Sequence, residues 1–347
     1  MLRLPPFTYM VPRSLAEAVA MIANQEPAEA MLVAGGTDLY PNMKRQQYEP
    51  KILVGLRQLR ELHGLTGNAR DGLTIGAGMT LTHMSQQRDI LTGYPALATA
   101  AGLVSTPQLR NMGTIGGNLC VDTRCNYYNQ TYWWRQAIGF CMKKDGATCW
   151  VAPGSTRCWA VSSSDTAPVL IALHAQVRLV GPAGERLLPV HALYRDDGIS
   201  YLGKRHDEII THILIPPATG TVMAYVKVRR RGAFDFPVLG VAVALRLDDA
   251  GVCTEARVVL GAVASAPLLA PEAAAVLVGQ RLTPEVIDTA AQVAFRPVKP
   301  LDNTDLTLSY RKKMVRVHVT RVLRQLAGLS VAPHRWDAGD ASMKEIG

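Results

Sequence analysis

The sequence predicts an α+β protein with two domains. Its 347 residues are enough for two or three domains with substantial cores, and 48% hydrophobic and 19% charged residues describe an ordinary globular protein. The run Pro216-Pro217-Ala218-Thr219-Gly220 has the composition of a domain boundary. Beyond it, three strand-like segments precede three helical ones, and strands grouped before helices indicate an α+β module.

The elements before this boundary are predicted from caps and apolar runs. Ser14-Leu15-Ala16-Glu17 is a capping box, and the apolar residues after it recur at helical spacing. Asp165 stands near the N-cap of a later apolar helix that has Pro168 in its first turn. In chain order we expect a helix from 15, strands at 30–33, 51–56 and 73–75, helices from about 82 and at 165–173, and strands at 175–180 and 208–215.

The elements after the boundary follow from apolar runs separated by turns. We expect strands at 222–228, 238–247 and 256–263, then helices at 271–278, 284–294 and 307–326. The last residues, 331–347, have the composition of a loose tail. The predicted domains are therefore 1–217 and 218–330, followed by the tail.

Charge and hydropathy exclude several classes of protein. The net charge is +9, and the basic residues bunch at 227–231 and 311–324, which indicates solvated faces or a docking surface for an acidic partner. We expect no nucleic-acid partner, because no motif of a nucleic-acid-binding fold is present. We also expect no membrane span, because no apolar run reaches about 18 residues. Without a recognisable signal peptide the expected location is the cytoplasm.

Two glycine-rich turns suit the diphosphate of a dinucleotide. They are Ala34-Gly35-Gly36-Thr37-Asp38-Leu39, directly after a predicted strand, and Thr114-Ile115-Gly116-Gly117-Asn118. A diphosphate needs converging backbone N–H groups, and glycine permits the close approach. Neither turn has the G-x-G-x-x-G spacing or the P-loop lysine, so each alone is compatible with a purely structural role. Together, with flanking polar side chains, they favour a ligand.

Four cysteines lie between residues 125 and 158 of the segment 120–164, which has little helical or strand periodicity. They are Cys125, Cys141, Cys149 and Cys158. Four thiolates can hold an iron–sulfur cluster or a tetrahedral zinc ion, but this spacing matches neither zinc ribbons nor bacterial ferredoxins. A cluster, a zinc site and unligated or disulfide-bonded thiols therefore all stay open. Cys120 is a possible replacement ligand, and Cys253 is expected to be a buried bystander.

These motifs resemble those of the FAD-binding medium subunits of the molybdenum hydroxylases, the xanthine dehydrogenase and carbon monoxide dehydrogenase family. The two glycine turns are similar to the family's FAD diphosphate motifs, residues 164–168 to its acidic FAD contact, and residues 225–227 to the start of its C-terminal domain. The resemblance implies an FAD-binding domain at 1–217, with subdomains of about 1–57 and 58–217, and a C-terminal domain of the CO dehydrogenase flavoprotein type.

The resemblance also implies which residues hold FAD. They are Leu32, Val33, Ala34, Gly35, Gly36, Thr37, Asp38, Leu39, Thr114, Ile115, Gly116, Gly117, Asn118, Asp165 and Lys227. An acceptor-only carboxylate at Asp165 suits hydroxyl groups of FAD, and its alternative role is a helix N-cap alone. For Lys227 the alternative is a surface ion pair. No catalytic residue is expected in this chain.

The cysteine segment departs from most of the family, which joins the second glycine motif to the acidic residue by a much shorter connection. An inserted four-cysteine loop, here about 120–164, is similar to that of the 4-hydroxybenzoyl-CoA reductase branch, where it carries an additional 4Fe–4S cluster. The resemblance thus implies that Cys125, Cys141, Cys149 and Cys158 are the cluster ligands.

The same resemblance implies the assembly and the direction of electron flow. The expected partners are a large subunit with the molybdenum cofactor and a small subunit with 2Fe–2S clusters, in a dimer of heterotrimers. Ferredoxin is the expected electron donor for reductive dehydroxylation of an aromatic substrate to benzoyl-CoA. The alternatives are an oxidative hydroxylase subunit with zinc or unligated cysteines in the loop, and a non-catalytic assembly protein with a structural zinc and no flavin.

Overall fold

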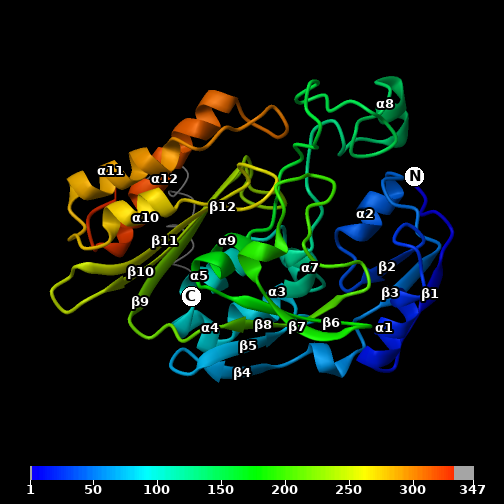
Figure 1. Ribbon diagram of the computed structural model, residues 1–347, viewed down its shortest axis with the longest axis horizontal. Helices are drawn as coiled ribbons and strands as arrows, with labels where there is room; N and C mark the ends of the chain where they lie inside the picture. The colour runs from blue at the N-terminus through cyan, green and yellow to red at the C-terminus, as the bar shows by residue number, and fades with distance from the viewer. Residues whose placement is uncertain (1, 332–347) are drawn as a thin grey trace, which may run out of the picture.

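The computed structural model describes residues 2–331, so almost all of the predicted tail lies outside the described residues. In the described part the chain forms three β-sheets, each with its own helices. Figure 1 shows them as an N-terminal block in blue, a central block in cyan and green, and a C-terminal block in yellow to red. The predicted α+β class is confirmed.

The N-terminal block is a small parallel sheet with strand order β1-β3-β2. The hydroxyl oxygen of Ser14 accepts a hydrogen bond from the backbone N–H of Glu17 at 3.2 Å, so the capping box begins a helix as predicted. The elements are β1 (Thr8–Met10), α1 (Leu15–Ala23), β2 (Ala30–Val33), α2 (Leu39–Lys44) and β3 (Ile52–Gly55). The chain leaves β2 through the first glycine turn and enters α2 directly.

The central block is an antiparallel sheet with strand order β4-β5-β8-β6-β7, covered by short helices. Its elements are the 3₁₀ turn η1 (Arg60–Leu62), β4 (Leu65–Asn68), β5 (Gly72–Gly76), α3 (Leu81–Gln86), α4 (Arg88–Gly93), α5 (Pro95–Gly102), α6 (Pro107–Arg110), α7 (Ile115–Leu119), α8 (Tyr132–Ala137), α9 (Thr166–Ala172), β6 (Gln176–Gly181), β7 (Gly184–Pro189), η2 (Val190–Leu193) and β8 (Ile209–Ile215). The second glycine turn forms the start of α7.

The C-terminal block is an antiparallel sheet backed by three helices, as the order of the predicted segments indicated. Its elements are β9 (Thr221–Val228), β10 (Leu239–Leu247), β11 (Cys253–Gly261), β12 (Leu268–Leu269), α10 (Pro271–Leu277), α11 (Pro284–Phe295) and α12 (Leu308–Leu326). Helix α9 is fully buried between this sheet and α5 and α7. One apolar core therefore runs from the central block into the C-terminal sheet, with Leu170, Tyr225 and Val259 among its members.

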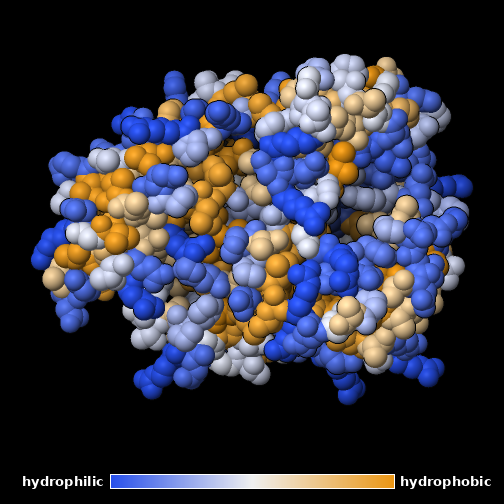
Figure 2. Space-filling model, in the orientation of Figure 1, coloured by the Kyte–Doolittle hydropathy of each residue, from blue (hydrophilic) through white to orange (hydrophobic). Residues whose placement is uncertain are grey.

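The inserted segment 120–164 is irregular except for α8, which the sequence analysis missed. Figure 1 shows this cysteine loop rising above the rest of the central block, with α8 over α2. Trp133 and Trp134 on α8 are exposed, and the corresponding upper surface is pale rather than strongly hydrophilic in Figure 2. None of the described helices combines the length and apolarity that crossing a membrane requires.

Candidate functional site

The two glycine turns lie directly against each other. A Cβ atom on Gly35 would lie 2.0 Å from the carbonyl oxygen of Met112, two residues before the second turn. Gly36 has φ +69°, in the left-handed region that glycine adopts without strain. A side chain at Gly35 is therefore incompatible with the close approach of the two segments, whereas a Cβ atom on Gly36 would collide with the Tyr40 ring.

The second turn presents its open side to a cavity. The hydroxyl oxygen of Thr114 accepts a hydrogen bond from the N–H of Gly117 at 3.1 Å and caps α7. Gly116 packs so tightly on Ala77 that a Cβ atom would lie 2.8 Å from the Ala77 methyl group. A Cβ atom on Gly117, in contrast, would meet only the Thr114 hydroxyl within 4 Å. Gly117 thus offers its backbone to open space.

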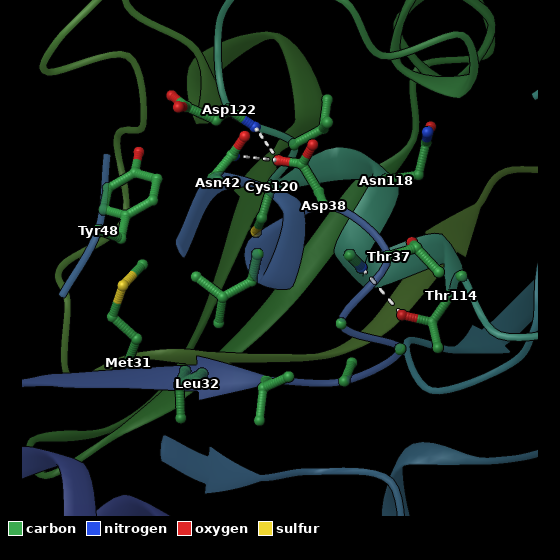
Figure 3. Close-up of a pocket in the computed structure, with 18 of the residues that line it drawn as sticks. Met31, Leu32, Thr37, Asp38, Asn42, Tyr48, Thr114, Asn118, Cys120 and Asp122 are labelled. Atoms are coloured by element: carbon green, nitrogen blue, oxygen red, sulfur yellow. Dashed lines mark hydrogen bonds between the residues drawn. The ribbon is translucent and has the colours of Figure 1, made fainter. Parts of the chain in front are cut away.

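Two cavities flank the paired turns. One has a volume of about 350 Å³ and the other about 320 Å³, and Gly35, Thr114 and Gly117 line both. These volumes lie at the small end of the range for ligand pockets, and the shared walls allow one extended ligand to occupy both. Figure 3 shows the larger cavity with Leu32 along one wall, Thr114 at one end and Tyr48 with Asp122 near the other.

Most of the predicted FAD residues line these cavities. The predicted residues in the wall of the larger cavity are Leu32, Val33, Ala34, Gly35, Gly36, Thr37, Asp38, Leu39, Thr114, Gly117 and Asn118. Gly116 lines only the smaller cavity. Ile115 belongs to the apolar core instead. Asp165 and Lys227 line neither cavity, so the structure does not bring them into the walls that the glycine turns form.

Asp38 ties the first turn to the start of the cysteine loop. Its carboxylate accepts hydrogen bonds from the side-chain amide of Asn42 at 3.2 Å and from the backbone N–H of Asp122 at 3.3 Å, the dashed lines at the top of Figure 3. It also forms an ion pair with Arg124. Burial lowers the pKa of that guanidinium to about 10, still far above neutral pH. Asp38 therefore has partners from the cysteine loop as well as a place in the cavity wall.

Asp165 and Lys227 form a buried ion pair. The Lys227 Nζ donates to the Asp165 carboxylate at 2.8 Å, and the Tyr225 hydroxyl donates to the other carboxylate oxygen at 2.8 Å. The two charged side chains are 1% and 2% exposed, so the surface ion pair offered as the alternative for Lys227 is wrong. Burial raises the pKa of Asp165, and the Lys227 charge opposes that rise.

The simple N-cap role of Asp165 is also not what the structure shows. Its side chain makes no capping hydrogen bond to α9. The hydroxyl oxygen of Ser164 accepts from the N–H of Ala167 at 3.1 Å instead. The Asp165 carboxylate is thus directed to the C-terminal block, where it joins β9 to the start of α9.

The four clustered cysteines share one cavity. Cys125, Cys141, Cys149 and Cys158 are all buried, and all line a small cavity that Tyr128, Met142, Lys143 and Trp150 help to close. All six cysteines of the chain are free thiols, so the disulfide alternative is not realised here. Within residues 2–331, no group of three or more His, Cys, Asp or Glu side chains is arranged to hold a metal ion. The four buried thiols nevertheless line one cavity, and four thiolates are a donor set that either an iron–sulfur cluster or a zinc ion takes.

Burial governs the protonation of these thiols. It raises the pKa of Cys125 to about 12 and that of Cys158 to about 11. At neutral pH both sulfur atoms therefore carry protons unless a metal takes their place, because a coordinating thiol is deprotonated. The other two cysteines lie elsewhere: Cys120 lines both flanking cavities, and Cys253 is buried at the start of β11. Cys120 therefore does not share the cavity of the four.

Comparison with known proteins agrees with this geometry. Residues 5–218 match the FAD binding domain in molybdopterin dehydrogenase, and residues 223–326 match the CO dehydrogenase flavoprotein C-terminal domain. This chain is an FAD-binding subunit of the molybdenum hydroxylase family. Its paired glycine turns and flanking cavities are thus part of a flavin-binding domain.

Relatives of this flavoprotein are similar over nearly their whole length. The carbon monoxide dehydrogenase medium chain of Afipia carboxidovorans is 30% identical over 92% of this chain and 96% of its own. The nicotinate dehydrogenase FAD-subunit of Eubacterium barkeri is 26% identical over 89% and 92%. The crystal structure of a Cu,Mo-CO dehydrogenase superimposes with a TM-score of 0.76 at 28% identity, covering 94% of this chain and 99% of that one.

Sequence reasoning missed several residues of the flavoprotein's cavities. Tyr48, Asp122, Tyr201 and Phe236 line the larger cavity although none belongs to a glycine motif. The smaller cavity is lined in part by His63, whose ring contacts the carbonyl of Arg57 at 3.0 Å. Only Asp122 could have been found from its position in the sequence, because it lies four residues after the second turn. The others come from segments whose meeting depends on the tertiary fold.

Proposed function

We propose that this chain is the FAD and 4Fe–4S electron-transfer subunit of a molybdenum enzyme, and that this enzyme is a 4-hydroxybenzoyl-CoA reductase. The observation that carries the proposal is the set of four buried thiols around one cavity, in an inserted loop next to the flavin cavities. Its role is to pass electrons from ferredoxin, by way of the cluster and FAD, toward 2Fe–2S clusters and molybdenum in partner subunits. We place this assembly in the cytoplasm as a dimer of heterotrimers.

The residues present fit both cofactors. Gly35 and Gly36 are the positions where backbone amides can approach a diphosphate, with the Thr37 and Thr114 hydroxyl groups beside them. The N–H groups of Gly116 and Gly117 already donate to the Ala77 carbonyl and the Thr114 hydroxyl, so we expect these two glycines to contribute close approach of the backbone. The cysteine quartet supplies four thiolates, the ligand set that a 4Fe–4S cluster takes. Bound FAD supplies the ability to collect single electrons into pairs. Asp165 and Lys227 stay predicted flavin contacts, although their side chains pair with each other.

The chain's own residues set the surroundings of the proposed cluster. Tyr128 and Ala160 close its cavity from inside, and Trp150, which is 40% exposed, covers it toward the surface. The indole N–H of Trp150 donates to the carbonyl of Phe140, which fixes the ring. A redox centre placed here is excluded from water yet lies close to the surface of the loop, as exchange with a protein donor requires.

A second candidate function is favoured by the names of the relatives. The similar proteins include carbon monoxide and nicotinate dehydrogenases, so an oxidative hydroxylase subunit with zinc or unligated cysteines in its loop is the alternative. In that case the loop has no part in electron transfer. The two candidates differ in whether the cysteines are needed for communication with a one-electron donor.

Reduction by two donors separates these functions. The anaerobically purified holoenzyme is mixed either with reduced ferredoxin or with a small artificial donor that reduces flavin directly, and bleaching of the flavin absorbance is followed. For Cys149→Ser we expect ferredoxin-driven bleaching to be lost and bleaching by the artificial donor to continue, because the flavin cavities lie outside the loop. Equal rates with ferredoxin in the wild type and Cys149→Ser would contradict the proposed role of the loop.

A further inference from the structure

A buried ion pair stands between the two candidate cofactor sites. Lys143 lines the cavity of the four thiols, and Asp122 lines the larger flavin cavity. The Lys143 Nζ and an Asp122 carboxylate oxygen are 2.8 Å apart, and the two side chains are 5% and 4% exposed. The positive end of the pair thus belongs to the thiol cavity and the negative end to the flavin cavity.

The Lys143 ammonium is held in one position. Its three donors match three acceptors: Asp122 at 2.8 Å, the Thr123 hydroxyl at 2.8 Å and the Gly198 carbonyl at 2.6 Å. The ammonium also lies 4.8 Å from the ring centre of Tyr128, which lines the thiol cavity as well. None of its protons is left for a sulfur atom, so Lys143 acts on the thiol cavity through its charge.

A contribution to the stability of the fold does not by itself explain the buried Lys143–Asp122 pair. Removing two charges from water is unfavourable, and a buried ion pair is often no more stabilising than apolar residues of the same volume. Its positive end nevertheless lies in the wall of the thiol cavity, whereas Asp122 does not line that cavity. A buried ammonium in this wall stabilises negative charge placed inside the cavity, because little water is present to screen it.

We propose that Lys143 raises the reduction potential of the 4Fe–4S cluster and that Asp122 partly cancels its effect. This inference rests on the proposed function, since it requires the cluster. Reduction adds an electron to an anionic centre, and a fixed positive charge in a poorly solvated site favours that step. The closer lysine outweighs the aspartate at the cluster, whereas the aspartate is the closer charge at the flavin cavity.

The test is a redox titration of the cluster, followed by its low-temperature EPR signal in anaerobically purified holoenzyme. For Lys143→Met we expect the equilibrium constant for one-electron reduction to fall about tenfold, which lowers the midpoint potential by about 59 mV. For Asp122→Asn we expect a shift in the opposite direction, because the ammonium is then uncompensated. Lys143→Arg keeps the charge and should retain a potential close to that of the wild type.

The neighbouring Lys144 provides the matched control. Its side chain is 32% exposed and pairs with Asp145 at 3.1 Å, so water screens its charge. Lys144→Met should leave the midpoint potential nearly unchanged. An equal shift in both lysine variants, or shifts of the same sign in Lys143→Met and Asp122→Asn, would overturn the inference.

These measurements distinguish a protein without the cluster from a protein whose cluster is insensitive to Lys143. Wild-type protein without iron would contradict the cluster itself, before any variant is considered. A wild type with iron whose potential is insensitive to Lys143→Met would contradict the electrostatic role alone. If Lys143→Met did not retain iron, Lys143→Gln would be compared with Lys143→Arg. Loss of iron from both would show that Lys143 builds the loop rather than sets a potential.

Discussion

The paired glycine turns and the cysteine loop are two cofactor regions built in different ways. The turns join regular elements, β2 to α2 and the start of α7, and each fits its place because a side chain would collide there. The cysteine loop has one short helix and offers side chains rather than backbone groups. The conformation of the glycine turns is thus set by residues next to them in the sequence. The conformation of the irregular cysteine loop depends on contacts with residues that are distant in the sequence.

The distant contacts of the cysteine loop come from both neighbouring blocks. The buried guanidinium of Arg135 on α8 donates to the backbone carbonyls of Arg45 and Gln46, each at 3.0 Å. On the other side Asn303 accepts from the N–H of Asn126 at 3.0 Å through its carbonyl, and its side chain donates to the carbonyl of Trp159 at 2.6 Å. Both ends of the loop are therefore clamped by residues far away in the sequence.

The largest expected effect comes from a side chain placed in the flavin cavity. Gly117→Val should abolish FAD binding while iron is retained, because the new side chain projects into space that only the Thr114 hydroxyl borders. Flavin released by denaturation and iron per chain are the two measurements. Gly154→Val, in the loop at a glycine with no atom within 4 Å, is the control that should keep both. A full complement of FAD in Gly117→Val would break the account of the turns.

Substitution of a cysteine in the loop should remove iron and leave FAD bound. Cys125→Ser or Cys158→Ser should lose most of the iron and keep FAD, since serine is a poor ligand for the cluster and neither cysteine lines a flavin cavity. Cys120→Ser and Cys253→Ser are matched controls that should keep the iron. Simultaneous loss of FAD and iron in Cys158→Ser would show that the two regions are not separable.

The next effect tests the buried ion pair that Asp165 forms with Lys227. Asp165→Asn leaves Lys227 buried without its counter-charge, and breaking a buried pair in this way costs about 3–5 kcal/mol. Urea unfolding of flavin-free protein should therefore show a large loss of stability. If stability were unchanged and only FAD retention fell, Asp165 would act mainly on the flavin, and the pair would not join the two blocks as we infer.

The smallest effect tests the clamp on the loop. Asn303→Ala removes the donor to the Trp159 carbonyl in a buried position, which should cost about 1–3 kcal/mol. We expect faster loss of iron to a chelator with FAD retention unchanged. Asp305→Asn alters an exposed neighbour and should behave as the wild type. Loss of FAD rather than iron in Asn303→Ala would show that Asn303 supports the flavin site and not the cysteine loop.

The glycine turns could be predicted from the sequence more completely than the cysteine loop. The capping box at Ser14 and both glycine turns depend on neighbours in the chain, so their positions were predictable. Helix α8 was missed because its first residues, Tyr132, Trp133 and Trp134, have low helix propensity, although Thr131 caps it. The Lys143–Asp122 and Asp165–Lys227 pairs were also out of reach, since tertiary folding alone brings their partners together.

The most direct test is the cofactor content of protein made and purified without oxygen. Iron, acid-labile sulfide, zinc and flavin are measured on one preparation of the full chain. We expect about four iron and four sulfide with one FAD per chain. Zinc in a stoichiometric amount, without iron or sulfide, would contradict the cluster and with it the assignment to a reductase.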